Sequence, residues 1–233
     1  MKSYEVTSII VVRKGSQRIL EKSMQQIGGK TLLQNKIEQL KQCHHIDRVI
    51  VGSDSLDMLE HASDCGAETI RRPDYYCDES RASANEMIRN MCGLIQTDVV
   101  VWAHCTNPFI SSATYDRAVE QFFTQKEHDS LLSVVKLQEH LWNADGTPHN
   151  YDPYAPRHTP ARQLPPYYMQ DGGIFINTHQ SMLSHSYFFG KRPFLFEIPS
   201  EEFMDINDER DLICARALFA HRLQQQTESP QTI

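Results

Sequence analysis

The chain has 233 residues and a formal net charge of −7 at pH 7, with 40% hydrophobic and 23% charged residues. This composition is typical of a folded domain with a core and excludes general disorder, and the acidic balance argues against a protein that coats nucleic acid. The apolar runs are too short to span a bilayer and the N-terminus lacks a signal-peptide pattern, so we expect a cytoplasmic protein without a membrane partner. The six scattered cysteines form no C-x-x-C pair and, in a reducing compartment, are expected to be buried thiols.

Strand-like runs alternate with helical periods through the first 137 residues. Strands are expected at 6–12, 47–52, 68–71, 98–103 and 129–137, and helices at 31–43, 55–65, 83–95 and 111–125. Gly66 stands where a helix C-cap is expected, and residues 83–86 have the S-x-x-E form of a capping box. The alternation predicts an α/β fold with a Rossmann-like, mostly parallel sheet and helices on both faces. In such folds ligands bind beyond the carboxyl ends of the strands.

This regular alternation ends near residue 140. Six of the eleven prolines fall at 148–166 and are interleaved with tyrosines. The segment is either an ordered surface excursion or an arm that packs on a partner subunit or closes over a site. Strands at 172–177 and 194–198 follow, with a last helix that starts at Asn207 or Asp208. We therefore expect a single domain over 1–226, which includes an arm at 140–170, and a flexible tail at 227–233.

The loop after the first strand, residues 13–30, is strongly basic. It carries five basic side chains against the single acid Glu21, a net charge of +4 within an acidic chain. Gly15 and Ser16 add a permissive backbone and a small hydroxyl, so the loop predicts a polyphosphate site, with a solvated basic loop as the alternative. The sequence Gly29-Lys30-Thr31 is not a P-loop, because Met24 stands at the required glycine position, and no G-x-G-x-x-G follows the first strand.

Several short motifs follow one another along the chain. They are R-K-G-S-Q at 13–17, Lys22, G-G-K at 28–30, V-I-V-G-S-D at 49–54, R-P at 72–73 leading to Ser83, A-H-C-T-N-P-F at 103–109, R-Q-L-P at 162–165, D-G-G-I-F-I at 171–176 and D-I-N-D-E-R-D-L at 205–212. This ordered set resembles the acylneuraminate cytidylyltransferases, also called CMP-sialic acid synthetases, and the related 3-deoxy-octulosonate cytidylyltransferases.

The resemblance implies a fold of the nucleotide-diphospho-sugar transferase type and a homodimer with a dimerisation arm. It implies transfer of CMP from CTP to the anomeric hydroxyl of a 2-keto sugar acid, with pyrophosphate as the second product and Mg²⁺ as the cofactor. The implied catalytic residues are Arg13, Lys22 and Asp205. The implied nucleotide-binding residues are Arg13, Gly15, Ser16, Gln17, Lys22, Arg72 and Ser83, the acceptor-binding residues are His104, Thr106, Asn107, Arg162 and Gln163, and the metal ligands are Asp205 and Asn207. Arg157 and His158 of the arm are further candidates to meet the acceptor's carboxylate in the other subunit.

The chain departs from the family pattern at four positions. Gln17 replaces a lysine, Ser23 an asparagine, His104 a glutamine, and Asn207 the second carboxylate of the metal pair. Two alternatives therefore stand beside the sugar-acid enzyme: a catalytically weak nucleotide-binding relative, and a cytidylyltransferase for another acceptor such as a phosphonate.

Some of these residues also have plainer interpretations. Ser83 and Asn207 both suit a helix N-cap. His104 suits a hydrogen bond to the acceptor, a general base, or simple polar lining. No cysteines and histidines have zinc-ligand spacing and no G-x-S-x-G motif occurs, so neither a zinc site nor a serine hydrolase is expected.

Overall fold

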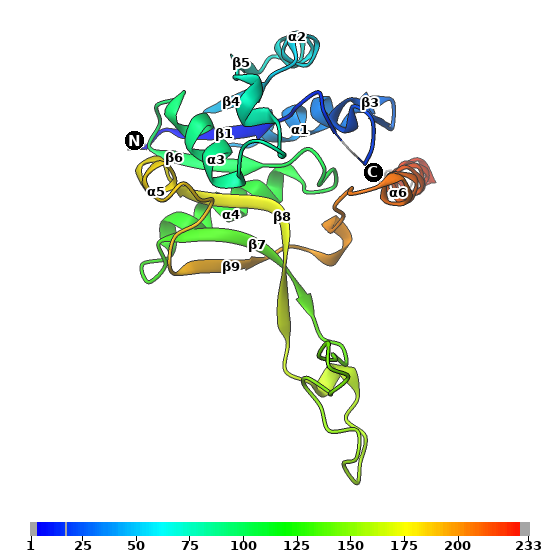
Figure 1. Cartoon of the computed structure of the whole chain (residues 1–233). Coiled ribbons are helices and arrows are strands. Elements are labelled where there is room, and N and C mark those ends of the chain that lie inside the picture. Colours follow the sequence, from blue (N-terminus) through cyan, green and yellow to red (C-terminus); the bar gives the residue numbers. More distant parts are fainter. Residues whose placement is uncertain (1–3, 17, 229–233) are drawn as a thin grey trace, which may run out of the picture.

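The computed structural model describes residues 4–16 and 18–228 (Figure 1). The strands are β1 (Val6–Val11), β2 (Gln26–Ile27), β3 (Lys30–Thr31), β4 (Arg48–Ser53), β5 (Glu68–Arg71), β6 (Val99–Ala103), β7 (Ser130–Leu137), β8 (Tyr167–Thr178) and β9 (Pro193–Glu197). The helices are α1 (Leu32–Lys41), α2 (Leu56–Asp64), α3 (Ala84–Gly93), α4 (Ser112–Thr124), α5 (His179–His185) and α6 (Glu209–Glu228), with short 3₁₀ helices η1 (Lys22–Met24), η2 (Asp74–Cys77), η3 (Ala161–Gln163) and η4 (Ser200–Glu202).

Seven strands form one sheet in the order β5-β4-β1-β6-β8-β7-β9. The pairs β4–β5, β1–β4, β1–β6 and β7–β9 are parallel, whereas β8 runs antiparallel to both of its neighbours. The expected mostly parallel sheet is therefore confirmed, with β8 as its one reversed strand. The carboxyl ends of β1, β4 and β6 lie at the same edge because these strands are parallel neighbours.

Two apolar cores lie on opposite faces of this sheet. Ile10 and Val51 pack in the core covered by α1, α2, α4 and α6, whereas Ile9 and Ile50 pack in the core covered by α3 and α5. Successive side chains of a strand point to opposite faces, so strands buried on both sides are expected to be mostly apolar. This pattern confirms that helices cover both faces.

The two helix-capping motifs expected from the sequence are present at the ends of their helices. Ser83 caps α3 in a capping box, in which Glu86 N–H donates to the Ser83 hydroxyl and the Glu86 carboxylate accepts from the Ser83 backbone. Gly66 ends α2 with a φ of +80°, a conformation that favours glycine.

The expected excursion leaves the body of the molecule as an extended arm (Figure 1). Strands β7 and β8 continue past the sheet edge as a two-stranded ribbon that pairs Val135 with Met169 and Leu137 with Tyr167. At the far end the chain exposes large side chains, among them Trp142 at 58% and Tyr154 at 92%. Strand β8 is thus longer than the strand expected at 172–177, because its first residues belong to the arm.

The C-terminal end differs from expectation. Helix α6 begins at Glu209 and continues to Glu228, so residues 227 and 228 are helical and not part of a flexible tail. Residues 229–233 lie outside the described residues, as does Gln17. Among residues 4–16 and 18–228, no helix is both long and apolar enough to cross a membrane.

Candidate active site

Three cavities meet at the carboxyl end of β1, where all three are lined by Val11. The first, of about 300 Å³, is lined by Arg13, Ser16, Arg18 and Lys22. The second, of about 360 Å³, is lined by Arg72, Tyr76, Ser83, Trp102 and His104, among others. The third, of about 280 Å³, is lined by His104, Cys105, Thr106, Gly172, Asp205 and Asn207. The site therefore lies where the topology of a parallel sheet predicts it.

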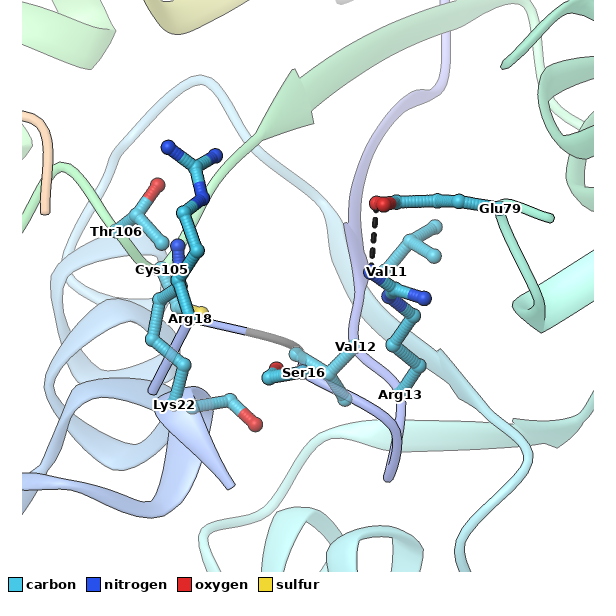
Figure 2. A pocket seen from close by; sticks show the side chains of 10 residues that line it. Val11, Val12, Arg13, Ser16, Arg18, Lys22, Glu79, Cys105 and Thr106 are labelled. Carbon is cyan, nitrogen blue, oxygen red and sulfur yellow. Dashed lines mark ion pairs between the residues drawn. The ribbon is translucent and has the colours of Figure 1, made fainter. Parts of the chain in front are cut away.

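The basic loop supplies three cationic side chains to the first cavity. Figure 2 shows Arg18 and Lys22 on one side of this cavity and Arg13, paired with Glu79, on the other. Arg13 Nη2 lies 2.7 Å from Glu79 Oε1, and Lys22 Nζ donates to the carbonyl oxygen of Ile206 at 3.0 Å. Burial lowers the pKa of Lys22, and the nearby Asp205 carboxylate opposes that shift. An anion could replace these internal partners.

Gly15 and Ser16 have different positions in this loop. Ser16 lines the first cavity, as expected of a residue that contacts phosphate. Gly15 is exposed, and a Cβ at this position would meet nothing within 4 Å. No neighbouring group in the described chain therefore requires a glycine there.

Arg72 is almost completely buried beside the second cavity. Its Nη2 donates to the carbonyl oxygen of Tyr76 at 3.1 Å, and its Nε donates to Asn90 Oδ1 at 3.4 Å. The buried Arg72 Nη1 and Trp102 Nε1 have no hydrogen-bond partner among the described residues. Both side chains line this cavity, so two buried donors without a partner lie beside it. The Ser83 hydroxyl, by contrast, is engaged in the α3 cap.

His104 follows β6 and lines both the second and the third cavity. Its Nδ1 lies 2.7 Å from the carbonyl oxygen of Gly172. Burial lowers the pKa of His104, whereas the hydrogen bond to Gly172 and the charge of Asp205 oppose the shift. The adjacent thiol of Cys105 is also buried, which raises its pKa to about 11 and keeps it protonated at neutral pH.

Asp205 and Asn207 lie side by side in the third cavity, as their i, i+2 spacing predicts. Asn207 Nδ2 donates to Asp205 Oδ2 at 2.7 Å, and Asn207 Oδ1 accepts from Arg18 Nη2 at 3.3 Å. Asn207 is not the helix N-cap. Asp208 has that role, because its Oδ1 accepts from Asp211 N–H at 3.1 Å one residue before α6 begins. The side chain of Asn207 is thus available to the cavity.

The remaining residues that were expected to bind the acceptor lie in different parts of the structure. Thr106 lines the first and third cavities. Asn107, expected to bind the acceptor, is only 1% exposed, and its Nδ2 donates to the carbonyl oxygen of Asp171. The side chain of Asn107 therefore points into the protein, and its role in binding the acceptor stays a prediction. Arg162 and Gln163 lie exposed in the arm, in η3, and line none of the three cavities of their own chain.

Two charged side chains at or near the site escaped the sequence analysis. Glu79 faces the first two cavities, and the acidic run at 78–79 was its only signal. Lys36 of α1 is fully buried behind the 104–107 turn, where Nζ donates to the carbonyl oxygen of Asn107 at 2.9 Å and to the Tyr115 hydroxyl at 3.0 Å. Burial lowers the pKa of Lys36 to about 7. A lysine inside an otherwise apolar helical period was the signal for this second residue.

The chain is similar to solved structures of nucleotide-binding enzymes. One is the CMP:2-keto-3-deoxy-manno-octonic acid synthetase complexed with CTP, with a TM-score of 0.69, 15% identity, and coverage of 94% of this chain and 99% of that one. Another is a 4-diphosphocytidyl-2C-methyl-D-erythritol synthase from Anaerococcus prevotii, with a TM-score of 0.65, 12% identity, and coverage of 94% and 96%. At these identities the likeness shows the fold.

The chain is also similar in sequence to curated cytidylyltransferases. A 3-deoxy-manno-octulosonate cytidylyltransferase from Chlorobium chlorochromatii is 33% identical over 58% of this chain and 52% of its own length. A pseudaminic acid cytidylyltransferase from Campylobacter jejuni is 24% identical over 91% of this chain and 94% of its own length. An N-acylneuraminate cytidylyltransferase from Escherichia coli O18:K1:H7 is 24% identical over 98% of this chain and 55% of its own length.

The match thus covers about half the length of two of these relatives and nearly all of the third. A family profile described as "Cytidylyltransferase" matches residues 7–227, a range that contains all three cavities. The chain therefore belongs to the cytidylyltransferase family, whose members are CTP-dependent nucleotidyltransferases.

Proposed function

We propose that this protein transfers CMP from CTP to the anomeric hydroxyl of a sialic acid-like 2-keto sugar acid, giving a CMP-sugar and pyrophosphate. The observation that carries the proposal is the gathering of Arg13, Arg18 and Lys22 around one cavity in a chain of net charge −7. Phosphoryl-type transfer needs mainly positioning and charge neutralisation, which these side chains supply. Arg13 and Lys22 neutralise the triphosphate, and Ser16 offers a hydroxyl to it.

The second cavity suits the cytosine and ribose. Cytosine presents a carbonyl oxygen and a ring nitrogen as acceptors, and the unpaired Arg72 Nη1 and Trp102 Nε1 are buried donors beside this space. Leaving a buried donor without a partner costs about 1–3 kcal/mol, so a ligand that pairs with it gains affinity and selectivity.

The acceptor occupies the space on the other side of His104. A cavity of about 520 Å³ at the foot of the arm shares Asp205 and Asn207 with the third cavity and is also lined by Met169, Phe203 and Met204. This mixture of polar and apolar lining suits a sugar acid with an acyl group.

Mg²⁺ fits the pair formed by Asp205 and Asn207. No group of three or more His, Cys, Asp or Glu side chains in the described chain could hold a metal ion. A magnesium ion at Asp205 would therefore complete its shell with phosphate oxygens and water, which is its usual mode in nucleotide enzymes. Asn207 contributes if its amide turns to present Oδ1, which requires release from Arg18. When bound, the ion would neutralise charge on the departing pyrophosphate.

A homodimer completes the proposal. Arg162 lies in an arm that exposes Trp142 and Tyr154, so the arm has large apolar surfaces for a partner subunit. In this arrangement Arg162, with Arg157 and His158, meets the acceptor's carboxylate in trans. All six cysteines are free, which is consistent with a cytoplasmic location.

The test is pyrophosphate release from CTP and Mg²⁺ with a panel of neuraminic, legionaminic, pseudaminic and octulosonic acids and a phosphonate. We expect release to depend on one of these acids, and Arg13→Ala to weaken CTP binding by roughly 1.5–3 kcal/mol in calorimetry. Tight CTP binding without release for any acid would favour the catalytically weak relative, for which the Arg18–Asn207 bond across the metal position is the supporting observation. Release only with a phosphonate acceptor would favour the other alternative.

A further inference from the structure

The hydrogen bond between His104 and Gly172 determines which nitrogen of the histidine ring carries a proton. Nδ1 lies 2.7 Å from the carbonyl oxygen of Gly172, and a carbonyl oxygen can only accept. Nδ1 must therefore donate. In a neutral ring the other nitrogen, Nε2, then carries a lone pair and no proton.

The surroundings of His104 hold the ring in this orientation. Phe175 and Phe188 stack on each other with centroids 4.6 Å apart, and the His104 ring packs edge-on against both, at 6.0 and 6.1 Å. Gly172, which supplies the accepting carbonyl, has a φ of +77°, a conformation that side-chain-bearing residues rarely adopt. The glycine therefore permits the backbone geometry that aims this carbonyl at the ring.

The ring also lies where the two reactants of the proposed function meet. His104 lines the cavity of Arg72 and Trp102, and it also lines the cavity of Asp205. No hydrogen-bond partner of Nε2 occurs among residues 4–16 and 18–228, and the ring is partly exposed. An acceptor hydroxyl that approaches a nucleotide phosphate from the Asp205 side would pass beside this nitrogen.

We propose that His104 is the general base of the transfer, an inference that rests on the proposed function. The hydroxyl oxygen of the acceptor attacks the α-phosphorus of CTP while Nε2 takes the hydroxyl proton. A new O–P bond forms, the bond from the α-phosphorus to the bridging oxygen breaks, and pyrophosphate leaves with that electron pair. The resulting imidazolium keeps its Nδ1 bond to Gly172 and later releases the proton to water. Burial and the charges of Lys36 and Lys22 disfavour the charged ring, which favours this later release of the proton.

The glutamine that the family resemblance places at this position cannot accept a proton in this way, which makes His104→Gln the sharpest variant. We expect turnover to fall by about 10²- to 10⁴-fold, the usual contribution of a general base. CTP affinity, measured by calorimetry, should fall much less than turnover, because we propose that Arg13 and Lys22 hold the triphosphate. Wild-type turnover in His104→Gln would overturn the proposal.

A second variant separates proton transfer from packing. In His104→Ala, added imidazole should restore turnover in proportion to its concentration and should not accelerate the wild type. His179 provides a matched control, since its Nε2 also lies 2.8 Å from a carbonyl oxygen, that of Cys92, and it lines none of the three cavities. His179→Gln should retain turnover within about twofold. Loss of activity in His104→Ala without any rescue would indicate a packing role and contradict the proposal.

The tautomer of His104 can be determined without the acceptor acid. In the full-length ¹⁵N-histidine-labelled protein at pH 7, correlation spectra should show a neutral His104 ring with a proton on Nδ1, assigned by its loss in His104→Gln. A proton on Nε2, or a charged ring, would overturn the general base even before any acceptor acid is found. The expected tautomer together with no turnover for any acid would instead reject the proposed function and, with it, this inference.

Discussion

Arg13 and Glu79 form an ion pair on one side of the first cavity, with 2.7 Å between Nη2 and Oε1 (Figure 2). Both side chains also line the neighbouring cavity of Arg72. A carboxylate thus faces the space in which we propose that a triphosphate binds. Nucleotide binding must therefore replace Glu79 by phosphate as the partner of Arg13.

Glu79→Gln should tighten CTP binding by roughly two- to fivefold, because an exposed ion pair is worth only about 0.2–1 kcal/mol and its loss frees Arg13 for the phosphates. Titration calorimetry at low and high salt measures this effect, and the gain should shrink as salt screens the charges. Glu120→Gln is the control, since Glu120 is similarly exposed and pairs with His45. Weaker binding in Glu79→Gln would mean that Glu79 holds Arg13 in the orientation that the nucleotide needs.

Asp205→Asn should lower turnover by roughly 100-fold or more, because it removes the carboxylate that we propose holds Mg²⁺. Circular dichroism should show an unchanged fold, since Asp205 is partly exposed. Turnover measured against Mg²⁺ concentration tests the role, and unchanged turnover at limiting Mg²⁺ would exclude it.

Asn207→Asp should reduce the Mg²⁺ concentration required for half-maximal turnover, because a second carboxylate would face the same point. Glu209→Gln changes a charge two residues away in the first turn of α6 and serves as the control. An unchanged Mg²⁺ requirement in Asn207→Asp would show that Asn207 does not contact the ion.

Lys36 should make the stability of the protein depend on pH. The pKa of this buried lysine is about 7 in the folded protein against 10.5 for an ordinary lysine. Below pH 7 the side chain is charged in both states, and folding carries the full cost of burying the charge. Between pH 7 and 10.5 the unfolded chain binds one proton more than the folded one, so stability from this residue rises with pH.

Lys36→Met removes this dependence. Its free energy of unfolding should therefore fall relative to the wild type by up to about 1.4 kcal/mol per pH unit between pH 7.5 and 9.5. Urea unfolding at several pH values measures the difference. Lys41→Met, at the exposed end of the same helix, should show no such trend. If the free energies of unfolding of the wild type and Lys36→Met differed by the same amount at every pH, Lys36 would stay charged inside the protein.

The arm predicts a dimer in solution with shared sites. Light scattering at micromolar concentration should give twice the mass of one chain, and a stable single-chain mass would exclude the dimer. Mixing inactive Arg13→Ala with inactive Arg162→Ala should restore activity in one of the two sites of each hybrid dimer. No recovery after verified subunit exchange would mean that the arm serves its own subunit.

The sequence predicted the elements that have strong periodicity and missed those that depend on distant contacts. Strands β1, β4 and β6 are mostly apolar because helices cover both faces, so they were visible as runs. Helix α5 was missed because its only buried side chain is Met182, which leaves no apolar stripe. The first half of β8 was missed because it is exposed and belongs to the arm.

In the candidate site too, features that are local in sequence were predicted, and features that depend on distant contacts were missed. The basic loop was predictable because its charge is local in sequence. The burial of Asn107 was not, since strand position alone does not decide which way a side chain points after the strand ends. The pairing of Arg13 with Glu79 depends on two loops that meet only in the folded chain.

The bond between Lys22 and the carbonyl oxygen of Ile206 joins residues that are 184 positions apart. During synthesis a ribosome releases the basic loop long before the segment that carries Asp205 exists. A nascent chain lacking this segment presents Lys22 without the carbonyl oxygen of Ile206. The whole cleft can therefore form only after the segment around Ile206 has been made and has folded back onto the basic loop.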